Sequence, residues 1–213
     1  MIDKNVYKYY GLGMRIMGYD RSIAKLVKKL NLNCPPEAKI LDAGCGTGAM
    51  GLSLIKKFQK STLLATDIDQ RFLHLVTAKA KRGRLDQTRI SVGFSDITSP
   101  HKVTPTNSPS ISLEQGSFDI VSSGACIGHS DNTENTIKIL LSLVKPGGYF
   151  ISLEMHHHFF ARYIAAKYHY PRLDLTRMKH LIESEGFSAE LTPLTLKHFP
   201  ANLTRVCLIA RKK

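Results

Sequence analysis

The 213-residue chain is long enough for one domain with a normal core, and its 43% hydrophobic and 22% charged residues exclude wholesale disorder. It carries 30 Lys and Arg against 17 Asp and Glu, a net charge of +13. Such an excess can mark a nucleic-acid partner, an anionic membrane surface or an anionic substrate, or it can be a solvated surface. No aromatic-interleaved basic stripe accompanies it, so nucleic acid is possible but not favoured.

The sequence has no apolar run near the roughly 18 to 20 residues that span a bilayer, and its first residues lack an apolar signal-peptide core. Its four cysteines are scattered without CxxC pairing, which fits a reducing compartment and indicates neither a disulfide framework nor a zinc site. We therefore expect a cytoplasmic protein without a transmembrane segment, either a monomer or a homodimer.

The first predicted element is a helix over 19–30, where apolar residues recur on one face. Two prolines, Pro35 and Pro36, mark the connection that follows. Residues 39–44 then read as a buried strand that enters a glycine-rich loop. The segment 49–58 reads as the next helix, with its lysines on the outer side.

A second apolar run at 61–69 is closed by acids and predicts a strand, and 70–83 predicts a helix after it. Residues 89–97 predict a third strand that also ends in an acid. The polar, proline-dotted stretch 98–116 shows no periodicity and is long for a connection, so we expect a surface insertion.

Residues 117–126 predict a fourth strand and 132–144 a helix, followed by a KPGG turn and a fifth strand at 149–157. The helix predicted at 175–186 ends at Gly186. Two strand-like runs joined by the short connection KHFPAN close the chain. They predict an antiparallel hairpin at the edge of the sheet.

This alternation predicts an α/β fold: a Rossmann-like, doubly wound sheet of seven strands, mostly parallel with an antiparallel C-terminal hairpin. Residues 1–33 are expected to form an N-terminal helical lid or cap, and residues 34–213 the ligand-binding domain. In such a sheet a ligand binds outside the carboxyl ends of the strands, where the glycine-rich loop lies.

The loop sequence ILDAGCGTGAM, at 40–50, fits more than one ligand. Gly44, Gly46 and Ala49 satisfy the looser G-x-G-x-x-A dinucleotide fingerprint, with acids about twenty residues on at Asp67 and Asp69. A lone match of this kind is weak, so the residues around it have to discriminate between ligands.

Three features point away from a dinucleotide. Asp42, just before the loop, would repel a pyrophosphate but attract an ammonium or sulfonium group. Gly48 extends the pattern to G-x-G-x-G, and Asp96 ends the third strand, where it can accept from an exocyclic amine. A ligand with a cationic amino-acid end, a ribose and an adenine fits this pattern, and S-adenosyl-L-methionine is such a ligand.

Five segments in register resemble the signature segments of class I S-adenosylmethionine-dependent methyltransferases: ILDAGCGTG, ATDID, FSDI, FDIVSS and LVKPGGYFIS. The resemblance covers about residues 37–213. It implies that the ligand-binding domain is a methyltransferase domain with S-adenosyl-L-methionine as cofactor and S-adenosyl-L-homocysteine as product.

The resemblance also implies a set of cofactor-binding positions at the strand ends. They are Asp42, Gly44, Cys45, Gly46 and Gly48 around the methionine part, Asp67 at the ribose with Ile68 against the adenine, Asp96 at the adenine amine with Ile97 alongside, and Ser122 and Ser123 near the transferable methyl.

One thiol and two acids in this region are expected to have structural roles instead of binding a ligand. The Cys45 side chain is expected to be a small packed residue, Asp69 a helix cap, and Asp119 a structural acid at a strand edge.

His129, after the fourth strand, is a candidate to orient or deprotonate the acceptor, although a helix-entry histidine is an alternative. In the run His156–His158, three consecutive histidines cannot face one point, so we expect no metal site. One or two of them can line a substrate pocket. The candidate substrate residues are Tyr10, Tyr19, His156, His157 and Phe160.

Three function classes compete. The first is a small-molecule methyltransferase of quinone, lipid or natural-product type. The second is an RNA or protein methyltransferase, suggested by the basic charge, although SSGA stands where base-amine methyltransferases show an Asn- or Asp-Pro-Pro-aromatic tetrad. The third is a cofactor-binding protein without catalysis, or a dinucleotide enzyme.

Overall fold

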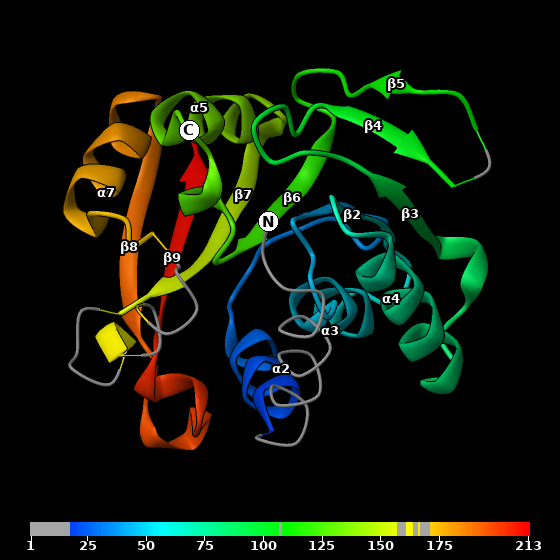
Figure 1. Cartoon of the computed structure of the whole chain (residues 1–213), viewed down its shortest axis with the longest axis horizontal. Coiled ribbons are helices and arrows are strands. Elements are labelled where there is room, and N and C mark those ends of the chain that lie inside the picture. The colour runs from blue at the N-terminus through cyan, green and yellow to red at the C-terminus, as the bar shows by residue number, and fades with distance from the viewer. Residues whose placement is uncertain (1–17, 107, 157–160, 164–165, 167–170) are drawn as a thin grey trace.

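The protein is built on one nine-stranded sheet in the order β5-β4-β3-β2-β1-β6-β7-β9-β8 (Figure 1). The computed structural model describes residues 18–106, 108–156, 161–163, 166 and 171–213. The strands are β1 (Lys39–Ala43), β2 (Thr62–Asp67), β3 (Ile90–Phe94), β4 (Lys102–Pro105), β5 (Ile111–Ser112), β6 (Phe118–Gly124), β7 (Val144–Met155), β8 (Phe187–Pro193) and β9 (Arg205–Lys212).

Helices cover both faces of the sheet. The described α-helices are α2 (Tyr19–Lys29), α3 (Ala49–Lys57), α4 (Gln70–Arg82), α5 (Thr133–Ser142) and α7 (Leu175–Ser184). Short 3₁₀ turns are η1 (Gln87–Arg89), η2 (Ile127–His129), η3 (Leu196–His198) and η4 (Ala201–Leu203).

The central strands are parallel, and the C-terminal hairpin is antiparallel. β1 pairs in parallel with β2 and β6, β2 with β3, and β6 with β7. β9 lies between β7 and β8 and runs antiparallel to both. The predicted doubly wound, mostly parallel sheet with an antiparallel C-terminal hairpin is confirmed.

The predicted number of seven strands is wrong, because the segment 98–116 adds two strands to the sheet. β4 pairs antiparallel with β3, and β5 with β4. Val103 is buried, and a Cβ at Gly93 would lie 2.5 Å from its Cγ1, so β4 approaches β3 closely at this glycine. Strands of four and two residues are too short to produce a readable alternation.

The predicted KPGG turn lies inside a strand. β7 starts at Val144, and its pairing with β6 shifts register between the pairs Phe118–Val144 and Ile120–Tyr149. Gly147 has φ +74° in this bulge, and a Cβ at Gly148 would lie 2.8 Å from the Asp119 carbonyl oxygen. The two glycines therefore allow the chain to bulge without leaving the sheet.

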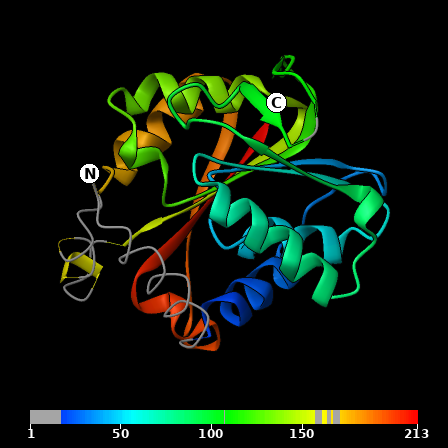
Figure 2. The same cartoon turned by 45° about the vertical axis from the view of Figure 1, so that its right-hand side comes forward.

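Neighbouring strand residues supply separate cores on the two faces of the sheet. Ile40 and Ile120 pack with α2, α3 and α4, whereas Leu41 and Val121 pack with α5 and α7 (Figure 2). The strand period of two produces this division, and burial on both faces explains the continuous apolar runs of β1 and β6.

Helix α2 is packed into the first core. Ile23, Leu26 and Val27 are buried there together with residues of β1 and α3. The rest of the predicted lid, residues 1–17, lies outside the described residues. Among the described helices, none is long and apolar enough to cross a membrane.

Candidate functional site

Four parallel strands bring their carboxyl ends to one edge of the sheet. Ala43 of β1 is in register with Thr66 of β2 and Ser123 of β6, and Asp67 of β2 with Phe94 of β3. The residues that follow these strands therefore meet at this edge, as predicted for the ligand site.

The glycine loop after β1 has a packed side and an open side. A Cβ at Gly44 (φ +64°) would lie 2.3 Å from the Cys126 Sγ, so this glycine allows the loop to contact the chain after β6. At Gly46 (φ +49°) no heavy atom lies within 4 Å of an added Cβ. The Cys45 amide, in contrast, donates to the Thr66 carbonyl at 2.8 Å, and its side chain is buried as expected of a small packed residue.

The Asp42 carboxylate lies beneath this loop and is 1% exposed. It accepts hydrogen bonds from the Gly51 amide at 2.9 Å and from the Ser122 hydroxyl at 2.8 Å. Burial raises the pKa of Asp42 to about 7. The side chain thus faces the first turn of α3 and not the open side of the loop.

Gly51 is required for this contact and was missed by the sequence reasoning. A Cβ at Gly51 would lie 2.7 Å from the Asp42 Oδ2. The amide at the start of α3, which a dinucleotide site would offer to a pyrophosphate, is instead bonded to the protein's own carboxylate. This arrangement disfavours a second anion there.

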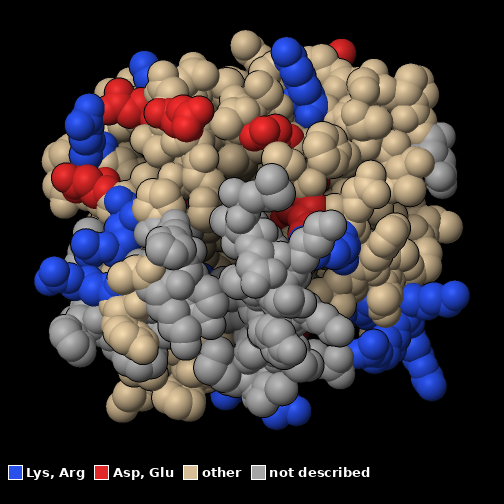
Figure 3. All heavy atoms as spheres, in the orientation of Figure 1, with Lys and Arg blue, Asp and Glu red and all other residues tan. Residues whose placement is uncertain are grey.

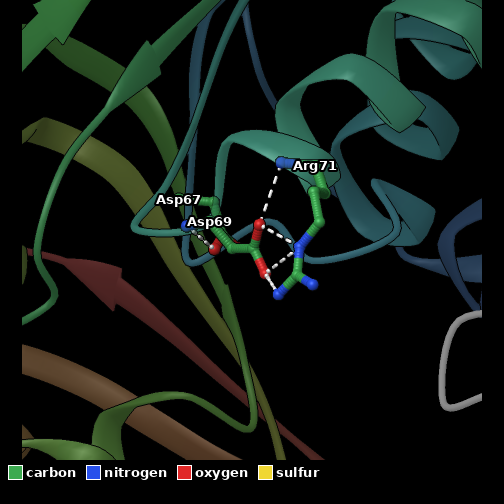
Figure 4. Close-up of polar contacts among 3 residues, drawn as sticks. All are labelled: Asp67, Asp69 and Arg71. Atoms are coloured by element: carbon green, nitrogen blue, oxygen red, sulfur yellow. Dashed lines mark hydrogen bonds and ion pairs between the residues drawn. The ribbon is translucent and has the colours of Figure 1, made fainter. Parts of the chain in front are cut away.

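Asp67 joins the end of β2 to the glycine loop. Its Oδ2 accepts from the Gly46 amide at 2.8 Å, and its Oδ1 accepts from the Asp69 amide at 2.9 Å (Figure 4). Burial raises the pKa of this carboxyl. The predicted ribose acid is therefore positioned against the open glycine of the loop.

Asp69 and Asp119 have the structural roles predicted for them. Asp69 accepts from the Arg71 amide at 2.9 Å, caps α4 and pairs with the Arg71 guanidinium, whose hydrogen bonds lower the pKa of Asp69 (Figure 4). Asp119 accepts from the Lys39 amide at 2.7 Å and from the Lys145 ammonium at 2.9 Å.

The residues after β2 and β3 include polar and apolar groups that could contact a ligand. Ile68 is 57% exposed although it is a large aliphatic residue. Asp96 is half-buried, and its Oδ1 accepts from the Thr98 amide and hydroxyl, both at 2.8 Å. The hydroxyl of Ser95 is buried and has no hydrogen-bond partner in the described part of the chain. Ile97 is half-buried against the second core.

Ser122 and Ser123 lie under the site surface. Both are fully buried. Ser122 donates to Asp42, and the Ser123 hydroxyl lies 3.1 Å from the Cys126 Sγ. Gly124, which follows them, is the first exposed residue after the strand interior, and a place of the two serines near a transferable methyl group stays a prediction.

Ala125, directly after Gly124, has φ +51°, a conformation that is strained for a residue with a Cβ. No sequence signal marks this position, since alanine gives no hint of a positive φ. Strain of this kind clusters at functional sites, which adds the loop after β6 to the candidate site.

His129 ends the 3₁₀ turn η2 in the same loop. Its side chain is exposed, and desolvation lowers its pKa, which favours the neutral imidazole. His156 follows β7, is half-buried, and donates its amide to the Thr204 carbonyl at 2.8 Å.

Tyr19, a candidate substrate residue, is buried, and a role for it at the substrate stays a prediction. Its side chain is 6% exposed within the first core, and its hydroxyl bonds to the Thr204 hydroxyl. The other expected substrate residues, Tyr10, His157 and Phe160, lie outside the described residues. Among those described, no three His, Cys, Asp or Glu residues are placed to hold a metal ion.

A polar network missed from the sequence ties α2 and α4 to the loop. The Lys79 ammonium bonds to the Asp20 carboxylate at 2.5 Å and to the Thr47 carbonyl at 2.9 Å. The Thr47 hydroxyl donates to the other Asp20 oxygen at 3.3 Å. Helix α2 is therefore linked through Lys79 to the glycine loop.

Comparison with known proteins identifies the family. A sequence model described as methyltransferase domain matches residues 16–190. The chain is 25% identical over 130 residues to a demethylmenaquinone methyltransferase of Leptospira interrogans, covering 61% of this chain and 48% of the relative. It is 29% identical over 125 residues to a malonyl-(acyl-carrier protein) O-methyltransferase of Priestia megaterium, covering 58% and 39%.

The chain thus spans about half or less of the length of these curated relatives. A solved S-adenosylmethionine-dependent methyltransferase from Aquifex aeolicus superposes with a TM-score of 0.68 at 14% identity and covers 100% of both chains, which shows the shared fold. The family model spans both the glycine loop and the strand ends around it. The chain belongs to the class I S-adenosylmethionine-dependent methyltransferases.

Proposed function

We propose that the protein transfers a methyl group from S-adenosyl-L-methionine to a small molecule of quinone, lipid or natural-product type. The observation that carries this proposal is the pairing of Asp67 with the open glycine Gly46, with exposed Ile68 next to it. A diol-binding carboxylate, an open backbone and an exposed apolar surface at one sheet edge suit a nucleoside joined to an amino acid.

The residues of this edge fit that cofactor in several separate respects. The open side of Gly46 leaves room for the methionine part, and Asp67 retains acceptor capacity for ribose hydroxyls. Ile68 offers an exposed face for adenine. Asp96 and the unpartnered Ser95 hydroxyl supply polar groups at the end of β3, where the adenine amine would bind.

Asp42 acts indirectly in this proposal. Its buried carboxyl group would hold the loop against α3, and it occupies the Gly51 amide that would otherwise be available to a pyrophosphate. This extends the sequence argument, because the carboxylate still excludes an anion although it does not reach the surface.

When bound, the cofactor supplies an activated methyl group on a sulfonium. The chain has to hold the acceptor atom about 3 Å from that methyl and in line with the breaking bond. If the acceptor is a hydroxyl or enol, a base must also take its proton. Exposed His129, with its lowered pKa, is our candidate base.

The names of the two curated relatives favour a small acceptor over RNA, since one refers to demethylmenaquinone and the other to a malonyl group on a carrier protein. We propose that His156, together with His157, Phe160 and Tyr10, borders the acceptor. We also propose a cytoplasmic location and a monomeric or homodimeric state.

Two experiments test the proposal. Isothermal titration should show binding of S-adenosyl-L-methionine and S-adenosyl-L-homocysteine and none of NAD. The opposite pattern would leave the family assignment but remove the proposed activity. A cell extract supplied with radiolabelled methyl donor and the protein should then direct label into the organic-soluble fraction. Label in nucleic acid, or in protein other than an acyl group on a carrier protein, would refute the small-molecule acceptor.

A further inference from the structure

Large apolar side chains gather on the two 3₁₀ turns between β8 and β9. Seven large hydrophobic residues are exposed in the described part of the chain, and three of them lie here: Leu196 at 84%, Phe199 at 63% and Leu203 at 38%. Their exposure is not fraying, because Leu194, His198, Ala201 and Thr204 between them are buried. The turns are anchored to the protein and hold apolar groups outward.

The outer face of α2 is cationic and lies beside these turns. Its exposed residues are Arg21, Ala24, Lys25, Lys28 and Lys29, whereas Ser22, Ile23, Leu26 and Val27 face the core. Both cartoon views place the helix next to the turns (Figures 1 and 2). The Ser22 hydroxyl donates to the Phe199 carbonyl at 2.6 Å and joins the two segments directly.

Within α2 and the segment 194–204, both of which the structure describes, no unpaired acid offsets this charge. The segment 194–204 contains no Asp or Glu and adds Lys197. The one acid of α2, Asp20, is bonded to Lys79. Lys25 and Lys29 also contribute to the lowered pKa of His198, after burial, which places their charges close to the turns. Blue side chains are visible at the lower edge of the molecule in the space-filling view (Figure 3).

We propose that the turn–α2 surface, formed by Leu196, Lys197, Phe199 and Leu203 with Arg21, Lys25, Lys28 and Lys29, docks on an anionic phospholipid membrane. An interface of this kind accepts apolar side chains just below the headgroups and attracts lysines to the headgroups themselves. A nucleic acid would match the charge but would leave Leu196 and Leu203 in water. A membrane interface accommodates both the apolar residues of the turns and the cationic residues of α2.

The turn–α2 surface lies near the candidate site. β9 starts at Arg205, opposite Met155 at the carboxyl end of β7, so the turns lie at the sheet edge that also carries the candidate site. Docking would hold that edge near the lipid phase. The inference itself does not depend on the proposed methyl transfer.

Vesicle sedimentation tests the proposal with the whole chain. The protein should pellet with phosphatidylcholine vesicles that contain phosphatidylglycerol, much less with phosphatidylcholine alone, and salt should weaken the binding. Leu196→Ser with Phe199→Ser should weaken binding roughly tenfold or more at unchanged net charge. Failure of the unsubstituted protein to bind anionic vesicles, or an unchanged apolar variant, would overturn the proposal.

Two double variants that remove equal charge from different helices distinguish a defined docking surface from a general effect of the basic net charge. Lys25→Gln with Lys29→Gln removes two exposed charges from α2, and the control Lys81→Gln with Arg82→Gln removes two exposed charges from α4. Only the first pair should lose vesicle binding, by roughly tenfold or more. Equal losses from both pairs would refute a defined surface. Thermal unfolding should show unchanged midpoints, and Leu196→Ser alone replaces the double variant if that one unfolds.

The same variants distinguish the membrane from a nucleic acid. In filter binding with single-stranded RNA, the Lys25 and Lys29 variant should behave like its control. If it loses RNA retention but keeps vesicle binding, the surface is a nucleic-acid site and the membrane proposal is wrong.

Discussion

The loop after β1 and the loop after β6 lie side by side at the same sheet edge, but they are built in opposite ways. In the first loop, buried carboxylates of Asp42 and Asp67 bind backbone amides. In the second loop, Ala125 is held at a positive φ, and the His129 side chain is exposed. Carboxylates bind the backbone of the first loop, whereas the second loop is packed through Ile127 and presents the His129 side chain outward.

This difference suggests a division of labour. A preformed loop binds a constant cofactor without having to be ordered first. A loop with exposed groups can suit the acceptor, which varies between family members. We therefore expect substitutions in the first loop to change cofactor affinity and stability, and substitutions in the second to change the rate of transfer.

The largest expected effect is on the second loop. His129→Ala should lower the methyl-transfer rate roughly 100-fold if the acceptor must lose a proton, because general-base catalysis commonly contributes that much. The affinity for S-adenosyl-L-homocysteine should stay constant in isothermal titration. His180→Ala on the exposed face of α7 is the control. An unaffected rate would exclude the base role of His129.

Next in size is the effect of Asp67→Ala on the first loop. It should weaken cofactor binding roughly tenfold to 100-fold, since hydrogen bonds to a charged group contribute about 1.5–3 kcal/mol. Isothermal titration measures it. Asp69→Asn, two residues further along the chain, should leave affinity nearly constant, because Asp69 caps α4 and pairs with Arg71. Equal losses from both variants would remove the ribose role.

Two glycine substitutions compare the packing of the two regions through the free energy of unfolding. Gly51→Ala should reduce the free energy of unfolding by about 1 kcal/mol or more, because the new Cβ would meet Asp42 Oδ2 at 2.7 Å. Gly124→Ala, at the last residue of β6 before the second loop, meets no atom within 4 Å and should change stability by about 0.5 kcal/mol or less. Urea unfolding compares them, and a neutral Gly51→Ala would contradict the tight contact.

A separate expected effect is a pH dependence from Asp42. Its pKa is raised from 3.8 to about 7 on folding, so the folded state holds an extra proton between these values. The stability that it contributes is complete below about pH 4 and is lost as pH rises through 7. Relative to Asp42→Asn, the protein should therefore lose free energy of unfolding from pH 5 to 7.5.

Asp86→Asn provides a control of opposite sign. Hydrogen bonds from Thr88 lower the pKa of Asp86, so its contribution is present above the unfolded pKa and is lost on acidification. Urea unfolding at pH 5 and 7.5 measures the Asp42 variant, and a further measurement near pH 3 measures the loss from Asp86. Parallel curves for the protein and Asp42→Asn would contradict the buried acid.

Most of the sheet could be predicted because glycines and acids mark the ends of its strands. The strands that end at Asp42–Gly44 and Asp67 were placed by those residues, and Asp69 was predicted as a cap from its position before a helix. β4 and β5 were missed because their pairing depends on contact with β3 and not on a local pattern.

Side-chain direction was harder to predict than position. β6 is buried on both faces, so no alternation tells which way Ser122 and Ser123 point. At Tyr19 a signal existed, since it lies four residues before Ile23 on the buried face of α2. The Asp42–Gly51 contact depends on packing between a strand and a helix, which sequence spacing alone does not reveal.

The carboxylate beneath the glycine loop also limits how this protein can evolve. Converting the loop to a phosphate-binding one would require removal of the Asp42 carboxylate, which would leave the Gly51 amide and the Ser122 hydroxyl without that acceptor. An amide or hydroxyl orphaned in the core costs about 1–3 kcal/mol. A single mutation toward another cofactor class would thus lose stability before it gained a new ligand. Contacts in the core of the domain thus couple its stability to the class of cofactor that it binds.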